Sequence, residues 1–288
     1  MLPGSSEQPS EHRRPLVFAH RGSSRRHAEH TLDAYLLAIE EGADGLECDV
    51  RLTRDGHLVC LHDSRIDRTS DGRGRVSTQT LAELDRFDFA SWRSDLPDSP
   101  DDLIVDRNQV DDHWRGKVLT LDRLLGVATD AGRPMRLLIE TKHPVRYGGA
   151  VEMELLRLLR RYGLDLPHPD RPLQVSVMSF SSTAVRRVRQ QAPGLPTVML
   201  IDVWSVPSRI GWLPPGSTIG GPGVQLLRAS PELVERLHRR GYPVYVWTVN
   251  EPDEVDLAVK LRVDGIISDR PAYVIERLRD MGLRDEHA

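Results

Sequence analysis

Residues 15–50 read "PLVFAHRGSSRRHAEHTLDAYLLAIEEGADGLECDV", and this stretch decides the fold. Its apolar run at 16–19 predicts a strand, and a second run at 45–50 predicts another. Between them, apolar residues recur at helical spacing, and Gly42 is a typical helix terminator. These apolar positions are Leu32, Tyr35, Leu36 and Ile39. A strand, a helix and a strand in this order favour an α/β protein with a parallel sheet.

The same alternation continues to the end of the chain. The runs that predict strands are 16–19, 45–50, 57–61, 136–139, 174–178, 197–201, 224–227, 244–247 and 265–267. The intervening stretches are typical of helices; in "SPELVERLHRRG", Ser230 is the expected N-cap and Gly241 the terminator. A parallel sheet, open or closed, is therefore expected. A chain of 288 residues is long enough for one α/β barrel, and we expect a single domain over residues 15–288.

Two connections depart from the alternation. Only seven residues separate Asp49 from His57, and a crossover with a helix needs about 10 to 12. This pair is either a hairpin or an extended return without a helix. An insertion at about 64–118 is too long for a plain loop, and we expect it to shape substrate access. Its acidic, proline-containing part, about 93–115, is expected to be a mobile cover, and residues 1–14 a disordered tail.

Composition excludes several partners. The formal net charge is −4 with both signs interspersed, so no nucleic-acid-binding face is expected. No stretch approaches the ~18 apolar residues of a membrane span, and the polar N-terminus lacks the apolar segment of a secretory signal. We therefore expect no stable membrane insertion and a cytoplasmic location. By strand periodicity Cys48 faces away from Glu47 and Asp49, whereas Cys60 shares a face with His62, so two separate buried thiols are expected.

Polar residues follow the apolar runs at their carboxyl ends. In a parallel barrel these ends lie on one face, where functional groups gather. The residues are His20 and Arg21, Glu47 and Asp49, His62 and Asp63, and Glu140 and Lys142. Because Glu47 and Asp49 are two positions apart, both point to the same side of their strand. The carboxylates of Glu47, Asp49 and Glu140 and the two imidazoles are thus expected to crowd one mouth.

Crowded carboxylates repel one another and need a compensating cation. A salt-bridged strand end would explain "LECDV" alone, but the addition of "IETK" at 139–142 favours a metal site. Oxygen ligands favour Ca²⁺ or Mg²⁺ over zinc. We therefore expect one divalent cation, either Ca²⁺ or Mg²⁺.

Eight blocks in order resemble the signature of the glycerophosphodiester phosphodiesterases. The blocks are "AHRG" at 19–22, "EHTLDAYLLAIEEGADGLECDVRLTRDGHLVCLHD" at 29–63, "RTSDGRGRVSTQTLAEL" at 68–84, "LTLDRLL" at 119–125, "IETK" at 139–142, "VMSF" at 177–180, "VWTVN" at 246–250 and "DGIISDRP" at 264–271. The resemblance spans nearly the whole folded chain. It implies a TIM (β/α)8 barrel with the insertion between the third and fourth strands, similar to phosphatidylinositol-specific phospholipases C.

The resemblance also implies roles at matching positions. His20 and His62 would be the acid and base pair, with His20 assisting attack and His62 protonating the leaving group. The metal ligands would be Glu47, Asp49 and Glu140, while Arg21 and Lys142 would hold the phosphate. Trp247 would be a wall for the alcohol moiety or, alternatively, a core tryptophan that caps the barrel. Asn250 would bind in the site or serve as an ordinary N-cap.

The chain departs from the family at one motif. The family commonly has a Pro-Glu-Asn triplet before the threonine of the first helix, and here Ala28 and His30 replace the Pro and the Asn. The loss of an asparagine donor leaves the orientation of Glu29 or a neighbour open. His30 would either replace that donor or cap the helix.

These residues suit the cleavage of a phosphodiester. Two histidines activate the attacking oxygen and protonate the departing one, and cations stabilise the charge that develops on the phosphate. The expected partner is a small-molecule glycerophosphodiester, cleaved to glycerol 3-phosphate and an alcohol. The alternatives are a lysophospholipase D that acts on acylated lysophospholipids, and a non-catalytic binder of phosphate esters. The alcohol group, the oligomeric state, and whether water or the substrate's own hydroxyl attacks stay open.

Overall fold

The chain folds into a closed parallel barrel, the TIM-type architecture that the sequence predicts. The computed structural model describes residues 14–93, 116–146, 148–168, 170–202 and 210–285. Its barrel strands follow the order β7, β6, β5, β4, β2, β1, β9, β8, with parallel neighbours, while β3 lies off this path. Parallel bridges from Gly220 to Val244 and from Gly223 to Trp247 join β7 to β8 and close the ring. The strands are β1 (Leu16–His20), β2 (Gly45–Leu52), β3 (Leu58–Cys60), β4 (Met135–Thr141), β5 (Leu173–Ser179), β6 (Thr197–Ile201), β7 (Ile219–Pro222), β8 (Tyr245–Val246) and β9 (Gly265–Ser268).

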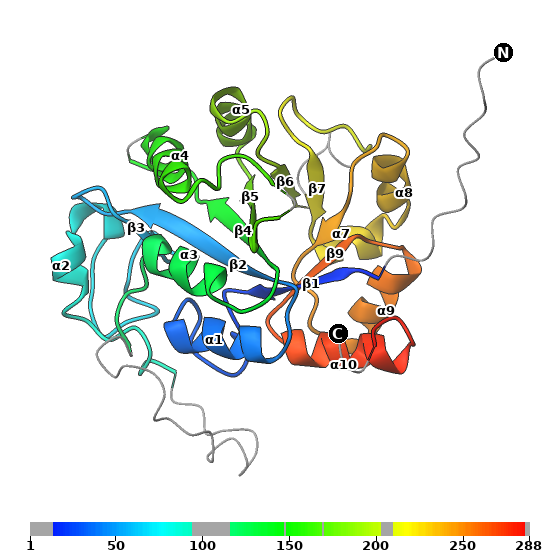
Figure 1. Cartoon of the computed structure of the whole chain (residues 1–288), viewed down its shortest axis with the longest axis horizontal. Helices are drawn as coiled ribbons and strands as arrows, with labels where there is room; N and C mark the ends of the chain where they lie inside the picture. The colour runs from blue at the N-terminus through cyan, green and yellow to red at the C-terminus, as the bar shows by residue number, and fades with distance from the viewer. Residues whose placement is uncertain (1–13, 94–115, 147, 169, 203–209, 286–288) are drawn as a thin grey trace, which may run out of the picture.

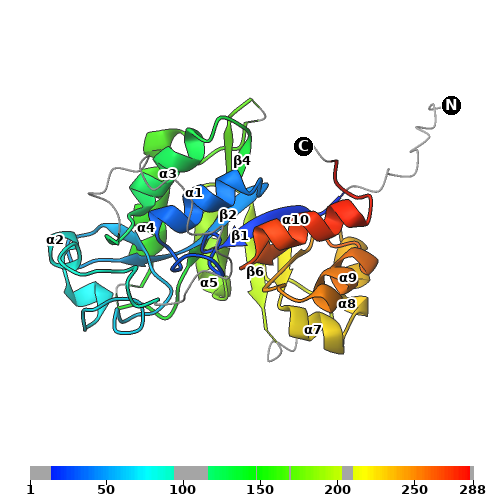
Figure 2. The ribbon, with the colours of Figure 1, turned by 90° about the horizontal axis from the view of Figure 1, so that it is seen from below.

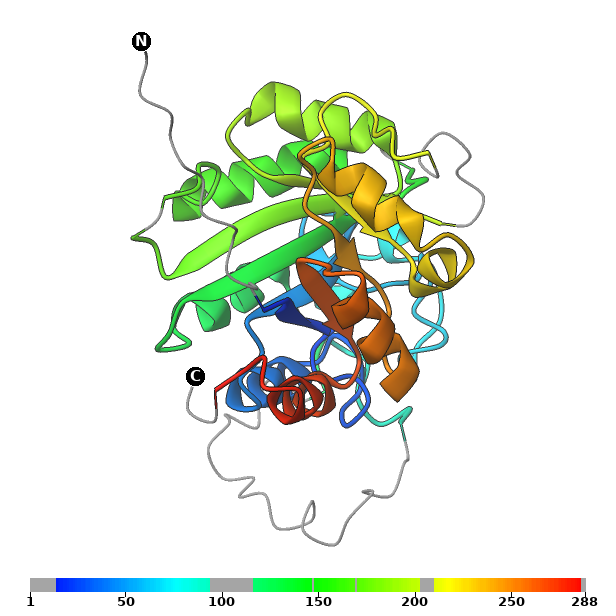
Figure 3. The same ribbon diagram turned by 90° about the vertical axis from the view of Figure 1, so that its right-hand side faces the viewer.

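Helices surround the strands (Figure 1). They are α1 (Leu32–Glu40), α2 (Leu81–Leu84), α3 (Leu121–Thr129), α4 (Ala150–Tyr162), α5 (Ser182–Gln191), α7 (Val224–Ala229), α8 (Glu232–His238), α9 (Pro252–Lys260) and α10 (Pro271–Asp280). Helix α5, for example, packs on β5 and β6, as the side view shows (Figure 3). The predicted first helix is capped by Thr31, whose hydroxyl accepts a hydrogen bond from the Ala34 amide. In the described part of the chain, no helix has the length and apolarity needed to span a membrane.

The predicted strand at 224–227 is wrong. These residues begin helix α7, and the strand is β7, whose sequence is IGGP. Two glycines and a proline are poor strand formers, so propensity hid β7, and only its place between β6 and β8 makes it a strand. The predicted cap of α8 also differs, because Ser230 ends α7 and Pro231 takes the N-cap position of α8.

The short connection after Asp49 is a hairpin. Strand β3 runs antiparallel to the outer half of β2, with Val50 opposite Cys60 and Leu52 opposite Leu58. The residues that follow β3 fold onto a small core of their own, separate from the barrel core. Its members are Val59, Leu61, Ile66, Val76, Leu84, Phe89 and Val118. In Figures 1 and 2 this region, with α2, lies at the end of the molecule far from α8 and α9. Two predicted segments lie outside the described residues. They are the cover at 93–115, except for Arg93, and the tail at 1–14, except for Arg14.

Strand periodicity divides the barrel interior into two levels. Phe18, Leu138 and Ile267 belong to an apolar cluster inside the ring. Two residues further along the same strands, the side chains become polar: His20 follows Phe18 and Glu140 follows Leu138. The lower interior is therefore an apolar core, and the functional groups lie above it at the carboxyl ends of the strands.

Strand periodicity, taken residue by residue, places Cys48 and Cys60 on opposite faces of the sheet. This expectation is wrong, because both cysteines lie on the same face of the β2–β3 pair. Both are free and buried and belong to one hydrophobic cluster between the strands and the helices. The reason is the antiparallel register: Cys60 lies opposite Val50, and Val50 points to the same face as Cys48.

A buried carboxylate joins the start of the barrel to both ends of the described chain. Asp44 accepts two hydrogen bonds from Arg14, both at 2.9 Å, one from Arg284 at 3.0 Å, and one from the Val17 amide at 2.8 Å. The Arg284 side chain is only 2% exposed. The cluster therefore ties β1, the start of β2 and the residues after α10 together.

Replacement of this carboxylate is expected to be costly. Asp44→Asn leaves the buried Arg284 charge uncompensated, and the free energy of unfolding should fall by about 3 kcal/mol in urea titrations. The control is Asp256→Asn, which breaks an exposed pair with Arg277 at 2.8 Å and should cost no more than about 1 kcal/mol. Equal losses in the two variants would show that Asp44 is no anchor.

Candidate active site

Three neighbouring strands bring the predicted polar residues together. In the register of the sheet, His20 of β1 lies beside Glu47 of β2, and Asp49 of β2 lies beside Glu140 of β4. Because these strands are adjacent and parallel, the four side chains gather at one end of the barrel. Lys142 follows β4 and His62 follows β3 at the same mouth.

Three of the carboxylates form a compact acidic cluster. Glu47, Asp49 and Glu140 each offer an oxygen, and these oxygens lie within 4.8 Å of one another. The three residues are 1%, 1% and 6% exposed, so water screens their mutual repulsion poorly. Burial, reinforced by Asp49, raises the pKa of Glu47 well above its usual range and that of Glu140 to about 8.

Asp49 differs from its two neighbours. Burial alone would raise its pKa, but the hydrogen bond from His30 and the charge of Arg21 hold this pKa well below the usual range. One of its oxygens, Oδ1, is buried and accepts no hydrogen bond of good geometry, although the Lys142 ammonium lies 3.2 Å away. A buried oxygen so poorly satisfied, beside two further carboxylates, fits a hard divalent cation, so Glu47, Asp49 and Glu140 are the residues that would hold it.

Arg21 and Lys142 partly balance the acidic cluster. Arg21 Nη1 donates to Glu29 at 3.0 Å, and its Nε lies 3.0 Å from Asp49 Oδ2. Lys142 Nζ lies 2.8 Å from Glu140 and 3.2 Å from Asp49 Oδ1. The Arg21 and Lys142 side chains are 17% and 12% exposed, so both cations adjoin the acidic cluster at the mouth of the barrel.

A carboxylate orients His20. Nδ1 of His20 lies 2.6 Å from Asp269 Oδ1, and its Nε2 lies 4.0 Å from Glu47. Asp269 is itself held by Asn250 Nδ2 at 2.7 Å and by Ser24 Oγ at 3.0 Å. Burial would raise the pKa of Asp269, but the bonds with His20 and its other donors lower it to about 2. The carboxylate therefore fixes Nδ1 and leaves Nε2 directed toward the acidic cluster.

A second carboxylate orients His62. Nδ1 of His62 lies 2.7 Å from Asp63, and Arg68 donates to Asp63 at 2.7 Å and to both oxygens of Glu29 at 2.7 and 2.8 Å. Nε of Arg51 donates a hydrogen bond to the carbonyl oxygen of His62 at 2.9 Å. Burial, together with the charges of Arg21 and Lys142, lowers the pKa of His62.

Two of these supporting residues, Asp269 and Arg68, are not among the predicted site residues. Asp269 lies in "DGIISDRP" directly after β9, and the rule that identified the other polar residues also applies to it. Asn250 is expected to bind in the site or to cap a helix. It holds Asp269, and the N-cap of α9 is Glu251, so the capping alternative is wrong. Arg68 gives no such signal, because it lies in the insertion and its partner Glu29 is 39 positions away.

Gly22 has a packing role. It adopts φ of 86°, and a Cβ there would lie 2.6 Å from the backbone of Ala34 in α1. Glycine therefore lets the loop after β1 pass directly over the first helix.

Trp247 lies between the barrel core and the mouth. Its Nε1 donates to the Gly221 carbonyl at 2.7 Å, and its ring meets Phe180 edge to face at 5.4 Å. Phe180 follows β5, is 42% exposed and lies 6.0 Å from the Lys142 ammonium. The two rings form an apolar wall beside the cations.

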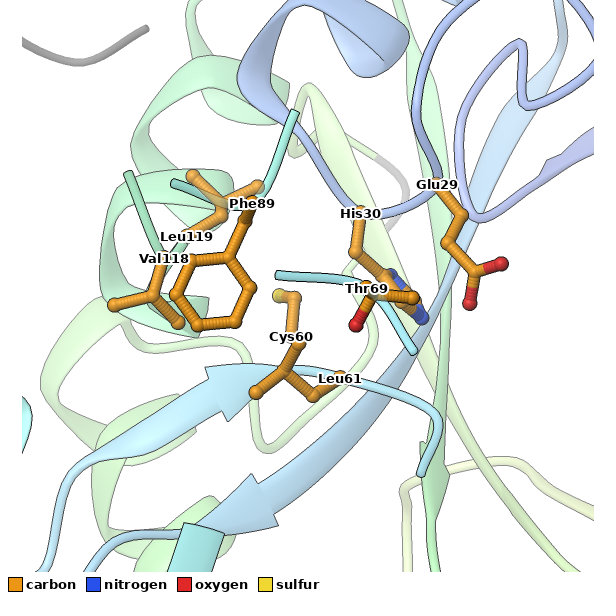
Figure 4. Close-up of a pocket in the computed structure, with 8 residues that line it drawn as sticks. All are labelled: Glu29, His30, Cys60, Leu61, Thr69, Phe89, Val118 and Leu119. Carbon is orange, nitrogen blue, oxygen red and sulfur yellow. The ribbon is translucent and has the colours of Figure 1, made fainter. Parts of the chain in front are cut away.

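The altered motif at 28–30 lies next to a small cavity (Figure 4). The cavity has room for about one water-sized molecule, and residues including His30, Cys60, Thr69 and Phe89 line it. The Glu29 carboxylate points away from the aromatic side of this cavity, toward Arg68. The helix cap is Thr31, so the capping alternative for His30 is wrong, and its ring instead contacts Asp49 at 2.9 Å.

A comparison with known families decides the assignment. The profile of the "Glycerophosphoryl diester phosphodiesterase family" matches residues 20–273. The chain belongs to this family. It is an enzyme of the phosphodiester hydrolase class, as its resemblance to the family predicts.

Named relatives agree with this membership. The chain is 44% identical over 267 residues to "Probable glycerophosphodiester phosphodiesterase 1" of Mycobacterium tuberculosis, covering 92% of this chain and 93% of the relative. A glycerophosphodiester phosphodiesterase of Bacillus subtilis is 31% identical, with 90% and 84% covered. Among solved structures, a phosphodiesterase of Oleispira antarctica in complex with the product sn-glycerol-3-phosphate has a TM-score of 0.70 at 22% identity, covering 92% and 97%.

The acidic cluster of this family member predicts a specific behaviour of Glu47→Gln. Because burial raises the pKa of Glu47 and so favours its neutral form when no cation is bound, the neutral glutamine should preserve the melting temperature in EDTA. The rise in melting temperature that Ca²⁺ or Mg²⁺ produces should be lost, with metal affinity reduced at least about tenfold in calorimetry. The exposed Glu235→Gln is the control. Unchanged metal affinity in Glu47→Gln would show that Glu47 is not a ligand.

Proposed function

We propose that this enzyme hydrolyses glycerophosphodiesters to glycerol 3-phosphate and an alcohol with the help of one divalent cation, Ca²⁺ or Mg²⁺. The observation that carries the proposal is the pair of carboxylate-oriented histidines, His20 with Asp269 and His62 with Asp63, beside a buried acidic cluster. The product named in the Oleispira antarctica complex supports the same substrate class.

Glu47, Asp49 and Glu140 hold the cation, which when bound supplies charge stabilisation to the phosphate oxygens. Arg21 and Lys142 lie on either side of this cluster and bind the remaining phosphate oxygens. As the negative charge of the diester grows in the transition state, these fixed cations stabilise it without having to reorganise.

His20 is the general base. With its Nδ1–H donated to the Asp269 carboxylate, its Nε2 is free to remove the proton from the attacking oxygen as the new P–O bond forms. His62 is the general acid, and it donates a proton to the alcohol oxygen as the old P–O bond breaks. Burial and nearby cations lower the pKa of His62, which makes the protonated ring a stronger acid but also reduces the protonated fraction as the pH rises.

The alcohol moiety meets the wall formed by Trp247 and Phe180. We propose that residues 61–93, which follow β3, shape access to this wall. Arg68 of this segment lies at the mouth, and its guanidinium carbon lies 6.0 Å from the centre of the Trp92 ring. The half-exposed Phe180 ring also favours a second candidate substrate, an acylated lysophospholipid, whose chain would cover that ring. The cytoplasmic location stays a prediction.

The test is a coupled assay for glycerol 3-phosphate. The panel contains glycerophosphodiesters with different alcohols and a lysophospholipid, each in EDTA, Mg²⁺ or Ca²⁺. Turnover of soluble diesters only with a cation supports the proposal. Turnover of lysophospholipid micelles alone supports the second candidate, and tight binding without turnover would indicate a non-catalytic binder.

A substrate with an activated leaving group distinguishes the roles of the two histidines. His20→Ala and His62→Ala should each lower kcat by about 10²- to 10⁴-fold on an alkyl diester. Because p-nitrophenolate leaves without a proton, His62→Ala should recover much of its activity on a p-nitrophenyl diester, whereas His20→Ala should not. Recovery of His20→Ala instead would reverse the roles, and recovery of neither would rule out the two-histidine mechanism.

Substitution of each orienting carboxylate should have the same pattern of effects as substitution of the histidine that it holds. Asp269→Asn should lower kcat about 10²-fold or more on both substrates, with KM nearly unchanged, because the tautomer of the base is no longer fixed. Asp63→Asn should lose activity on the alkyl diester but recover it on the p-nitrophenyl diester. An equal response of the two variants to the change of leaving group would contradict separate assignments.

A further inference from the structure

His30 is the one residue of the altered motif that reaches the acidic cluster. It is 3% exposed and adopts φ of 62°, a left-handed conformation that few side chains tolerate. We propose that His30 is a positioning residue for the metal-binding carboxylates: its Nε2–H holds one oxygen of Asp49 and leaves the other oxygen to the cation. This inference rests on the proposed metal-dependent function.

The two oxygens of Asp49 have different surroundings. Oδ2 lies 2.9 Å from His30 Nε2 and 3.0 Å from Arg21 Nε. Oδ1 accepts no hydrogen bond of good geometry, and the Lys142 ammonium lies 3.2 Å from it. Because a carboxylate only accepts, Nε2 of His30 carries the proton in this contact. His30 therefore occupies one side of the carboxylate and turns the other side toward Glu47 and Glu140.

The His30 ring is itself fixed. The Tyr35 hydroxyl lies 2.8 Å from its Nδ1. Because Nε2 carries the proton of the ring, Nδ1 accepts the single hydroxyl proton of Tyr35. Tyr35 is fully buried in helix α1. The backbone of His30 donates to the Arg21 carbonyl at 3.0 Å, which fixes the base of the side chain. A ring held at both ends has one orientation and presents one donor to Asp49.

A matched pair of substitutions separates this role from simple packing. His30→Leu and His30→Gln have side chains of similar size and carry the same backbone strain, but only glutamine has an N–H to donate. Calorimetry with Ca²⁺ and Mg²⁺, without substrate, should show metal affinity reduced by about 10- to 100-fold in His30→Leu. His30→Gln should recover most of this loss. His238→Leu is the remote control, because it removes a histidine that contacts Asp264 at 2.8 Å outside the site, and it should bind metal as the unmodified enzyme does.

Several results would overturn the proposal. Equal metal affinities in His30→Leu and the unmodified enzyme would do so, as would equal losses in His30→Leu and His30→Gln. If His30→Leu does not fold, Tyr35→Phe provides the test: it frees the ring and should weaken metal binding about threefold or more, and unchanged affinity would overturn the proposal.

The same experiments distinguish a failure of the His30 proposal from a failure of the proposed hydrolysis. An unmodified enzyme that binds neither cation would overturn both the metal-dependent function and this proposal. An enzyme that binds a cation and loses it in His30→Leu, yet turns over no substrate of the panel, would support the role of His30 and overturn the hydrolysis.

Discussion

The site depends on the desolvation of three carboxylates at one end of a barrel whose lower interior is apolar. Removing such charges from water costs several kcal/mol for each ion, and attraction to neighbours offsets this cost only with good geometry. Arg21 and Lys142 supply part of the offset, and together with the hydrogen bond from His30 they hold the pKa of Asp49 well below its usual range. Glu47 and Glu140 keep raised pKa values. This remaining imbalance is the physical basis for expecting a divalent cation there.

Several groups of the proposed site are held by partners from distant parts of the chain, although His62 is oriented by its sequence neighbour Asp63. Asp269 of the last strand orients His20 of the first, and His30 from the first loop contacts Asp49 of the second strand. Arg68 links the insertion to Glu29. The site is therefore assembled by closure of the barrel, since these partners meet only when β1 lies between β2 and β9.

The sequence predicts the parts of this structure that follow local rules. The alternation of strands and helices, and the side on which Glu47 and Asp49 lie, follow from periodicity over a few residues. These rules do not predict strand β7, because three of its four residues, in IGGP, are glycine or proline. Residues 224–227 are predicted as a strand instead because they form a mostly apolar run. The pairing of His20 with Asp269 spans 249 positions, so it needs the register of the closed sheet. The target of His30 likewise depends on where the loop crosses β2.

The hairpin of β2 and β3 places the two proposed proton-transfer residues in different structural units. His20 extends from a strand of the barrel, whereas His62 follows an added antiparallel strand that leads into a region with its own small core. Substitutions that repack this region can displace His62 and reshape the surroundings of the departing alcohol while the cation-binding strands keep their geometry. Selection can thus act on the leaving group and on glycerol phosphate recognition as two nearly independent traits.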